Sequence, residues 1–255
     1  MKLTFLGTGT SQGVPVIGCD CSVCRSVNPK DHRLRTSAMF EADGVTMVFD
    51  SGPDFRQQML REKVDNIDAI VFTHEHKDHV AGLDDVRPFN FRHKKDMPIF
   101  CTKRVFDSLK REYLYIFDDQ FSYPGIPKIQ VNIIENKPFV IGGVDVMPVE
   151  VWHHKLPVFG YRIGDMAYIT DANRIEASEK EKLKGLQVLV INALRKEKHI
   201  SHFNLKEAIQ LGTELGAENV YLTHISHLLG EHDDVSEELP SNVHLAYDGL
   251  TVSVR

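Results

Sequence analysis

The chain of 255 residues lacks long apolar stretches. No run approaches the roughly 20 residues that a membrane-spanning helix needs. The apolar part of the N-terminal segment 1–7 is also too short for a signal peptide. We therefore expect a soluble, cytoplasmic protein with no membrane partner.

A strong excess of charge is missing as well. The chain has 30 Lys+Arg against 36 Asp+Glu, a formal net charge of −6, and it contains no long basic run. A broad basic surface for nucleic acid is therefore absent, and we do not expect nucleic acid as a partner. A small anionic substrate has to be held locally instead. The length fits one large α/β domain over residues 1–255, with a substantial core, better than two small domains.

Cysteine is scarce, and its placement is uneven. Of four cysteines, Cys19, Cys21 and Cys24 lie within six residues and Cys101 stands alone. In a cytosolic chain such a cluster favours metal binding over a disulfide, although three buried free thiols remain the alternative. A tetrahedral structural zinc needs a fourth ligand, often His. The run Thr223-His224-Ile225-Ser226-His227 offers His227 for this place.

The most informative motif is His74-x-His76-x-Asp78-His79, directly after the apolar segment 69–72. Imidazole and carboxylate are ligands that zinc, manganese and iron accept, and an ion with an open position for water needs about three protein ligands. A single His at a strand end is usually a surface residue, and a chain with 13 His brings a few together by chance. Three His and an Asp at this spacing instead favour half of a two-metal site.

Short apolar runs rich in β-branched residues predict strands that alternate with amphipathic helices. Alternation of this kind indicates a layered α/β fold, and a sheet whose strand ends converge on one edge is the expected place for a site. The predicted strands cover 3–6, 46–49, 70–72, 144–147, 168–170, 188–191, 220–222 and 251–254. The predicted helices cover 54–61, 105–111, 177–183 and 205–215, the last with Asn204 as N-cap and Gly216 as its stop.

Segment 89–129 is crowded with aromatic and basic residues. It predicts an inserted helical segment whose aromatic residues pack inward, since aromatics at helical spacing usually do so. A substrate lid or the surface of a homodimer are the alternatives. The aromatic residues are Phe89, Phe91, Phe100, Phe106, Tyr113, Tyr115, Phe117, Phe121 and Tyr123.

Further metal-ligand candidates follow other predicted strands. The pair His153-His154 precedes Phe159-Gly160-Tyr161-Arg162-Ile163, Asp171 closes the strand ending at Thr170, and His224 follows Thr223. A lone Asp after a strand is most often a cap or turn residue, so Asp171 gains weight only from the other candidates.

Together these motifs resemble the metallo-β-lactamase-fold hydrolases. The resemblance implies a four-layered αββα sandwich, of class α/β (α+β), with two metal ions at one edge of the sheets. It further implies that one ion is bound by His74, His76 and His154, the other by Asp78, His79 and His224, and that Asp171 bridges them.

The same resemblance assigns two supporting residues. His154 lies six residues before Gly160, where related enzymes place the ligand, so His153 is expected to support the ligands instead of binding metal. Asp50 matches an early Asp of the family that orients the His run and does not bind metal. A turn-forming role for Asp50 is compatible with this function.

The cluster of Cys19, Cys21, Cys24 and His227 is similar to the structural zinc site of PhnP-like cyclic-phosphate phosphodiesterases. There, such a site ties the N-terminal loop to the end of the fold. The likeness spans nearly the whole chain except segment 89–129, which has no match. Its shorter motifs are Gly7-Thr8-Gly9, Gln12-Gly13-Val14-Pro15, Leu239-Pro240-Ser241 and Asp248-Gly249.

A departing alkoxide needs a proton donor, and His is the usual choice. His202 lies in the loop before a predicted helix, where PhnP-like and ribonuclease Z-like enzymes carry a His that binds no metal. We therefore predict His202 as general acid, beside Asp78 in the catalytic set. His199 is the alternative candidate for this role. The third possibility is that His202 is a solvent-exposed histidine without a catalytic role. Arg33 and Arg35 could bind a distal phosphate, but solvated surface arginines are more common.

The resemblance implies a metal-dependent phosphodiesterase that cleaves small, including ribosyl cyclic, phosphodiesters with two Zn²⁺ or Mn²⁺ ions and one structural Zn²⁺. A ribonuclease Z-like tRNA-processing nuclease is the first alternative. Those enzymes insert a tRNA-gripping arm before the bridging Asp, whereas only residues 155–170 separate His154 from Asp171 here. A non-catalytic metal-binding protein of the same fold is the second alternative, and lactamase or thioester hydrolysis is compatible with the fold.

Overall fold

The computed structural model describes residues 1–118, 120 and 123–254, and these residues form two β-sheets that pack face to face. The first sheet has the order β15-β1-β2-β3-β4-β5-β6, and the second the order β11-β8-β9-β10-β12-β13-β14 with β7 paired to β8. The strands of the first sheet are β1 (Lys2–Gly7), β2 (Ser37–Ala42), β3 (Val45–Phe49), β4 (Ala69–Val71), β5 (Met97–Cys101), β6 (Ile129–Ile133) and β15 (Thr251–Ser253). Those of the second are β7 (Phe139–Ile141), β8 (Val144–His153), β9 (Leu156–Ile163), β10 (Met166–Ile169), β11 (Arg174–Ile175), β12 (Val188–Asn192), β13 (Asn219–Thr223) and β14 (Val243–Leu245).

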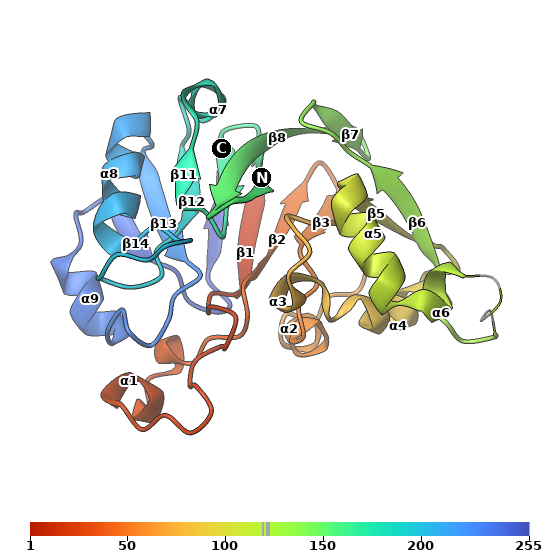
Figure 1. Ribbon diagram of the computed structural model, residues 1–255, viewed down its shortest axis with the longest axis horizontal. Helices are drawn as coiled ribbons and strands as arrows, with labels where there is room; N and C mark the ends of the chain where they lie inside the picture. Colours follow the sequence, from red (N-terminus) through yellow and green to blue (C-terminus); the bar gives the residue numbers. More distant parts are fainter. Residues whose placement is uncertain (119, 121–122, 255) are drawn as a thin grey trace.

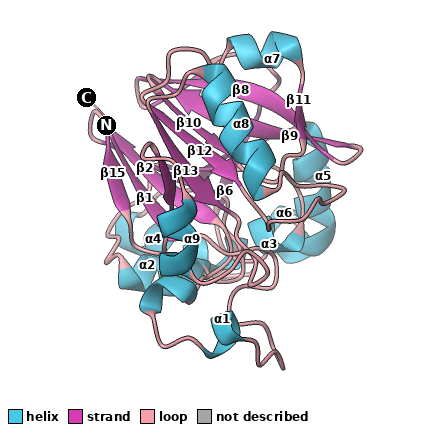
Figure 2. Cartoon of the chain, turned by 90° about the vertical axis from the view of Figure 1, so that its left-hand side faces the viewer, coloured by secondary structure: helices cyan, strands magenta, loops and turns pink. Residues whose placement is uncertain are grey.

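Helices cover the outer face of each sheet, as Figures 1 and 2 show. The first sheet carries α2 (Phe55–Arg61), α3 (Lys77–Val80), η2 (Leu83–Val86), α4 (Arg87–His93), α5 (Lys103–Glu112) and α6 (Leu114–Phe117). The second carries α7 (Ala177–Glu181), α8 (Leu205–Leu215) and α9 (His232–Glu238). The resulting four layers confirm the predicted αββα sandwich.

Apolar side chains between the two sheets form the central core. Alternate residues of a strand point to opposite faces of its sheet, so Phe5 and Phe49 of the first sheet meet Tyr161 and Tyr168 of the second. The ring of Phe49 stacks on Tyr161 at 5.6 Å and on Tyr168 at 5.2 Å between centroids. Two further clusters lie between each sheet and its helices. This core fixes the relative position of the strand ends.

All predicted strands and helices coincide with observed elements, within shifted ends. Helix α8 has the predicted caps: Asn204 and Glu207 form a reciprocal capping box, and Gly216 takes the left-handed conformation at φ 66°. None of the described helices is long and apolar enough to cross a membrane.

The prediction of an inserted helical segment at 89–129 is wrong in part. The segment contains α5 and α6, but also β5, which pairs in parallel with both β4 and β6. It is therefore an integral edge of the first sheet. Phe89, Phe106 and Tyr113 pack in the outer core as predicted, whereas Phe91 and Tyr123 are exposed. Phe121 lies outside the described residues.

A separate short helix, α1 (Ser22–Arg25), lies on a loop that projects from the sandwich, and η1 (Pro29–Asp31) follows it. The loop joins β1 to β2 and carries all three clustered cysteines. It therefore places the cysteines outside the main core.

Candidate metal centre

The predicted ligands lie where strands of both sheets end. Three important side chains come one or two residues after a strand: Asp50 after β3, Asp171 after β10 and His224 after β13. Each of these residues takes a left-handed backbone conformation, with φ of 63°, 51° and 54°, respectively. Such conformations are costly for residues other than glycine and cluster at functional sites. The sharp turn at each strand end directs the side chain into the space between the sheets' edges.

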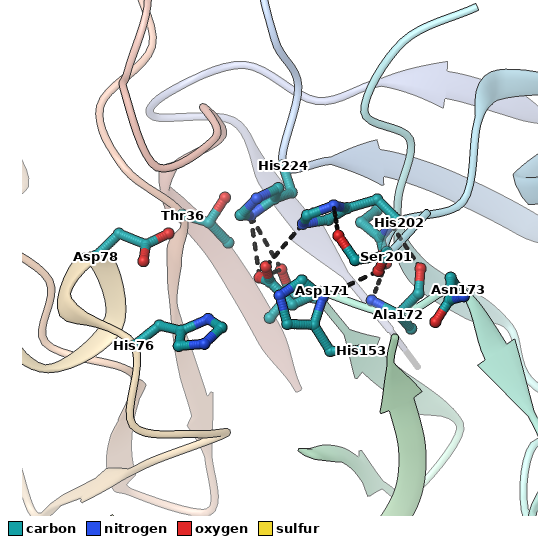
Figure 3. Close-up of polar contacts among 12 residues, drawn as sticks. Thr36, His76, Asp78, His153, Asp171, Ala172, Asn173, Ser201, His202 and His224 are labelled. Atoms are coloured by element: carbon teal, nitrogen blue, oxygen red, sulfur yellow. Dashed lines mark hydrogen bonds and ion pairs between the residues drawn. The ribbon is translucent and has the colours of Figure 1, made fainter. Parts of the chain in front are cut away.

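One group of potential ligands consists of His74, His76 and His153. Their ligand atoms lie within 4.8 Å of one another, and His74 Nε2 is 3.0 Å from His76 Nδ1. His153 Nδ1 is 2.9 Å from the carbonyl oxygen of Ser201, which can only accept, so Nδ1 carries the proton. The lone pair of Nε2 is thereby free for a ligand, and Figure 3 shows the ring beside His76 and Asp171.

The choice of His154 over His153 is corrected by the structure. His154 is exposed, takes a left-handed conformation at φ 57°, and donates its backbone N–H to Asn173 Oδ1 at 2.8 Å. The physical reason is the β8–β9 hairpin. His153 is the last paired residue of β8, opposite Leu156, and His154 begins the turn, so its side chain points away from the cluster.

A second group surrounds one carboxylate oxygen of Asp171. Asp171 Oδ2 lies 3.0 Å from His79 Nε2 and 3.1 Å from His224 Nδ1. Asp78 Oδ2 is 3.3 Å from the same His79 nitrogen. The predicted members of the second ion's ligand set are therefore together, and Asp171 lies between the two groups as a bridging ligand must.

A buried carboxylate orients this group from behind. Asp50 Oδ2 accepts a hydrogen bond from His79 Nδ1 at 2.6 Å, and Asp50 also accepts from the backbone N–H and the hydroxyl of Thr73. This bond turns Nε2 of His79 toward Asp78 and Asp171, the usual role of a partner behind a metal ligand. The position of Asp50 agrees with its predicted orienting role.

The turn after Asp50 and the start of α3 come close together, and this close contact depends on a glycine. A Cβ atom at Gly52 would lie 2.1 Å from the carbonyl oxygen of Asp78, so no other residue fits there without a backbone shift. The turn after Asp50 can therefore lie directly against the first turn of α3. This contact fixes the height of Asp78 and His79 relative to Asp50.

The electrostatics of the site suit a divalent cation. Burial lowers the pKa of His74, and it lowers the pKa of His224 to about 4, so both rings are neutral with lone pairs available. Burial also opposes protonation of His79, but Asp78, Asp171 and Asp50 together raise its pKa well above the ordinary value. Among the described residues, the buried Nε2 of His79 has no hydrogen bond of acceptable geometry despite its two carboxylate neighbours. A cation shared by these groups would satisfy both the nitrogen and the carboxylates.

His202 lies on the far side of Asp171 from His79. Its Nε2 is 3.0 Å from Asp171 Oδ1, and its ring stacks on His224 with centroids 5.0 Å apart. The residue comes from the loop that leads into α8 and is 9% exposed, and Figure 3 shows its ring beside His224 and Asp171. The structure therefore brings His202 to the cluster but holds its Nδ1 away from it.

The cysteine cluster forms a second, separate site. The Sγ atoms of Cys19, Cys21 and Cys24 lie 3.3, 3.4 and 3.6 Å from His227 Nδ1, and all four ligand atoms lie within 4.8 Å of one another. Four donors around one point fit a closed tetrahedral site. The Cys24 backbone N–H, followed by His227, lowers the pKa of Cys21 to about 6, which favours the thiolate, whereas burial raises the pKa of Cys24 to about 11.

The arginines near this loop do not face the histidine cluster. Arg33 is buried and donates to Thr8 Oγ1 and the carbonyl oxygen of Ala246 at 2.9 and 2.6 Å. Arg35 pairs with Asp54 at 2.9 Å. Both guanidinium groups thus have structural partners, and neither is placed to bind a distal phosphate at the histidine cluster.

Several contributing residues could not be read from the sequence. Ser201 orients His153 through its carbonyl oxygen, and Thr73 holds Asp50, but neither residue type signals such a role. The placement of His153 at the cluster had one available signal, the β-hairpin register of residues 144–163, which places residue 153 opposite residue 156.

Comparison with known proteins agrees with this geometry. Residues 46–225 match the family described as the beta-lactamase superfamily domain. A crystal structure described as a new diphosphatase from the PhnP family is 40% identical, has a TM-score of 0.92, and covers 98% of this chain and 96% of that one. The chain therefore belongs to the beta-lactamase superfamily and, within it, to the PhnP family.

Two further relatives define how far the likeness extends. An octanoyltransferase of Porphyromonas gingivalis is 40% identical over 253 residues, which are 98% of this chain and 51% of that protein. The chain thus spans about half the length of the curated relatives it matches. The Zn(2+)-bound PqqB of Methylobacterium extorquens has a TM-score of 0.81 over 100% of both chains, but its 19% identity shows a shared fold alone.

Proposed function

We propose that this chain is a metal-dependent hydrolase of small phosphoric diesters, including cyclic phosphates, and of diphosphates. The observation that carries the proposal is the position of Asp171. One of its carboxylate oxygens faces His79 and His224, and the other faces His202, a histidine that is available for proton transfer. The name of the PhnP-family relative, a diphosphatase, supports phosphorus as the centre attacked.

The residues present fit two divalent cations, zinc or manganese, in the histidine cluster. His74, His76 and His153 would hold one, Asp78, His79 and His224 the other, and Asp171 both. When bound, such a pair supplies an activated water and neutralises charge on the phosphoryl oxygens. Cys19, Cys21, Cys24 and His227 would hold a structural zinc.

The protein's own groups then have distinct tasks. Asp50 keeps the His79 ring in place, and the Ser201 carbonyl oxygen does the same for His153. Water adds to phosphorus while the bond from phosphorus to the leaving oxygen breaks. His202 Nε2 donates the proton that this leaving oxygen needs. The proton lost by His202 is replaced by the one that the attacking water releases.

A hydrolysis panel with metal analysis of the same sample tests the proposal. We expect bound divalent metal and faster turnover of cyclic phosphates, bis(p-nitrophenyl) phosphate or dinucleoside diphosphates than of thioesters or lactams. Normal metal content without hydrolysis of any phosphate ester would favour a non-catalytic metal-binding protein. Faster, salt-dependent cleavage of precursor tRNA would favour the ribonuclease Z alternative.

The general acid has its own test. His202→Ala should reduce turnover of substrates with alkoxide leaving groups by about 10²–10⁴, the usual contribution of proton transfer. Activated aryl esters need little protonation of the leaving oxygen, so their rate should change far less. Equal losses on both substrates, with metal content unchanged, would contradict the assignment.

A further inference from the structure

A second histidine stands behind His202. His199 lies in the same loop, half-buried at the surface, and its Nδ1 is 3.1 Å from Nδ1 of His202. Ser201 Oγ lies between the two rings, 3.3 Å from His199 Nδ1 and 3.0 Å from His202 Nδ1. The ring nitrogen of His202 that points away from Asp171 is thus enclosed by two polar side chains.

The hydrogen-bond pattern gives the direction of this contact. The backbone N–H of Ser201 points to His199 Nδ1 at 3.4 Å, and an N–H group can only donate. His199 Nδ1 is therefore an acceptor, and the nitrogen that faces it, Nδ1 of His202, must be the donor. On the opposite side of the His202 ring, Nε2 faces a carboxylate oxygen, which also accepts.

The loop has several backbone anchors besides the His199 side chain. The carbonyl oxygen of Ile200 accepts from Asn173 Nδ2 at 3.0 Å, and that of Ser201 is bonded to His153. The backbone N–H of Phe203 donates to the carbonyl oxygen of Ala172 at 2.7 Å. These bonds anchor the loop to the strand ends of the second sheet. The His199 ring is thus free to serve another purpose.

We propose that His199 is a positioning residue that accepts the Nδ1–H of His202 and so fixes the ring with Nε2 beside Asp171, the place from which it would donate to the leaving oxygen. This inference rests on the proposed hydrolysis of phosphate esters. Without His199, the His202 ring keeps, among the described residues, only Ser201 Oγ and Asp171 as hydrogen-bond partners, so its Nε2 is held less firmly. Positioning of a reacting group within hydrogen-bond reach is what makes general acid catalysis effective.

Two variants separate this role from a merely structural one. His199→Ala removes the acceptor, whereas His199→Gln keeps an acceptor oxygen in a side chain of similar reach. His93→Ala is the matched control, because His93 is, like His199, a half-buried histidine, at the end of α4, and its Nε2 contacts the carbonyl oxygen of Asp65. The two substrates are a ribose 2′,3′-cyclic phosphate, with an alkoxide leaving group, and bis(p-nitrophenyl) phosphate, with an activated one.

His199→Ala should lower kcat on the cyclic phosphate by about tenfold or more, part of the 10²–10⁴ that proton transfer contributes, with little change in KM. The rate on bis(p-nitrophenyl) phosphate should stay within about twofold, and His199→Gln should recover most of the loss. Equal losses on both substrates, or no recovery with Gln, would overturn the inference while leaving the proposed hydrolysis in place. If the wild-type protein hydrolyses neither substrate, the proposed function fails, and this inference fails with it.

Discussion

The described residues contain two clusters of potential metal ligands, and these clusters are built in opposite ways. The histidine cluster is formed at strand ends of both sheets, and most of its members are buried. The cysteine cluster joins the loop that carries α1 to a residue shortly after β13, and its members are half-exposed. One cluster is held by the core, whereas the other holds a loop onto the core.

The two clusters also differ in the number and type of their donor atoms. Cys19, Cys21, Cys24 and His227 are four donors around one point, which leaves no position for water or substrate. The histidine cluster offers seven candidate ligand residues in two groups that share Asp171, with oriented partners behind it and His202 beside it. A closed set of thiolates is typical of a structural ion, and a larger set of imidazoles and carboxylates leaves open positions for chemistry.

The largest effect is expected at the residue shared by both ligand groups. Asp171→Asn should lower phosphodiester hydrolysis by more than about a hundredfold, beyond the 10–100-fold typical of residues that only orient ligands. One carboxylate charge would be lost between His79 and His224, so metal content in this cluster should fall too. The cysteine cluster should keep its metal. A variant that stays within tenfold of the wild-type rate would contradict a bridging role.

The neighbouring histidines at the end of β8 provide a matched pair. His153→Ala should cost about a hundredfold in rate or metal affinity, because its Nε2 faces the ligand cluster. His154→Ala should change the rate less than about twofold and the unfolding free energy by no more than about 0.5 kcal/mol, as for other surface substitutions. Comparable losses in the two variants, measured by kinetics and metal analysis, would return His154 to the ligand set.

A smaller effect on activity, but a clear one on stability, is expected in the cysteine cluster. Cys21→Ser removes one of the four donors, so it should release about one zinc per chain. Stability should fall as well, because a structural metal contributes its binding energy to folding. A loss of about 2 kcal/mol would lower Tm by about 4–8 °C in a domain of this size. The metal of the histidine cluster and the rate per folded molecule should be preserved. Unchanged zinc content would show that the thiols are not ligands.

The smallest effect concerns how the cysteine loop is anchored. His232 of α9 lies 3.1 Å from Arg33, and burial, then Arg33, lowers its pKa from 6.5 to about 4. Between these values the unfolded chain binds a proton that the folded chain excludes, so stability falls as the pH drops from 6.5 toward 4. His232→Gln should flatten this part of the curve of Tm against pH. An unchanged slope would mean that other groups control it.

The sequence predicted those parts of the molecule whose signals are local. The run from His74 to His79, Asp171 after its strand, and the spacing of the cysteines each depend on neighbours along the chain, and the structure places these residues in two clusters. Their binding of metal stays a prediction. The αββα fold is confirmed, and it could be predicted because strands such as β12 are short apolar runs and helices such as α8 have helical apolar spacing and clear caps.

Other features depend on strand register or on how loops pack, and the residue pattern did not reveal them. The choice between His153 and His154 required the register of the β8–β9 hairpin, in which a shift of one residue reverses the direction of every side chain. The sequence did not indicate strand β5 because its short apolar run, residues 97–101, contains Pro98 and lies amid many aromatic residues. The contact of His199 with His202 depends on how the loop between β12 and α8 folds back.

The most direct test of the central claim is an anomalous difference map from crystals grown with zinc. The account predicts peaks at both clusters, with those in the histidine cluster about 2.0–2.2 Å from ligand atoms that include His153 and Asp171. It also predicts one peak among Cys19, Cys21, Cys24 and His227. A map with zinc in the cysteine cluster and none between His153 and Asp171 would contradict the account.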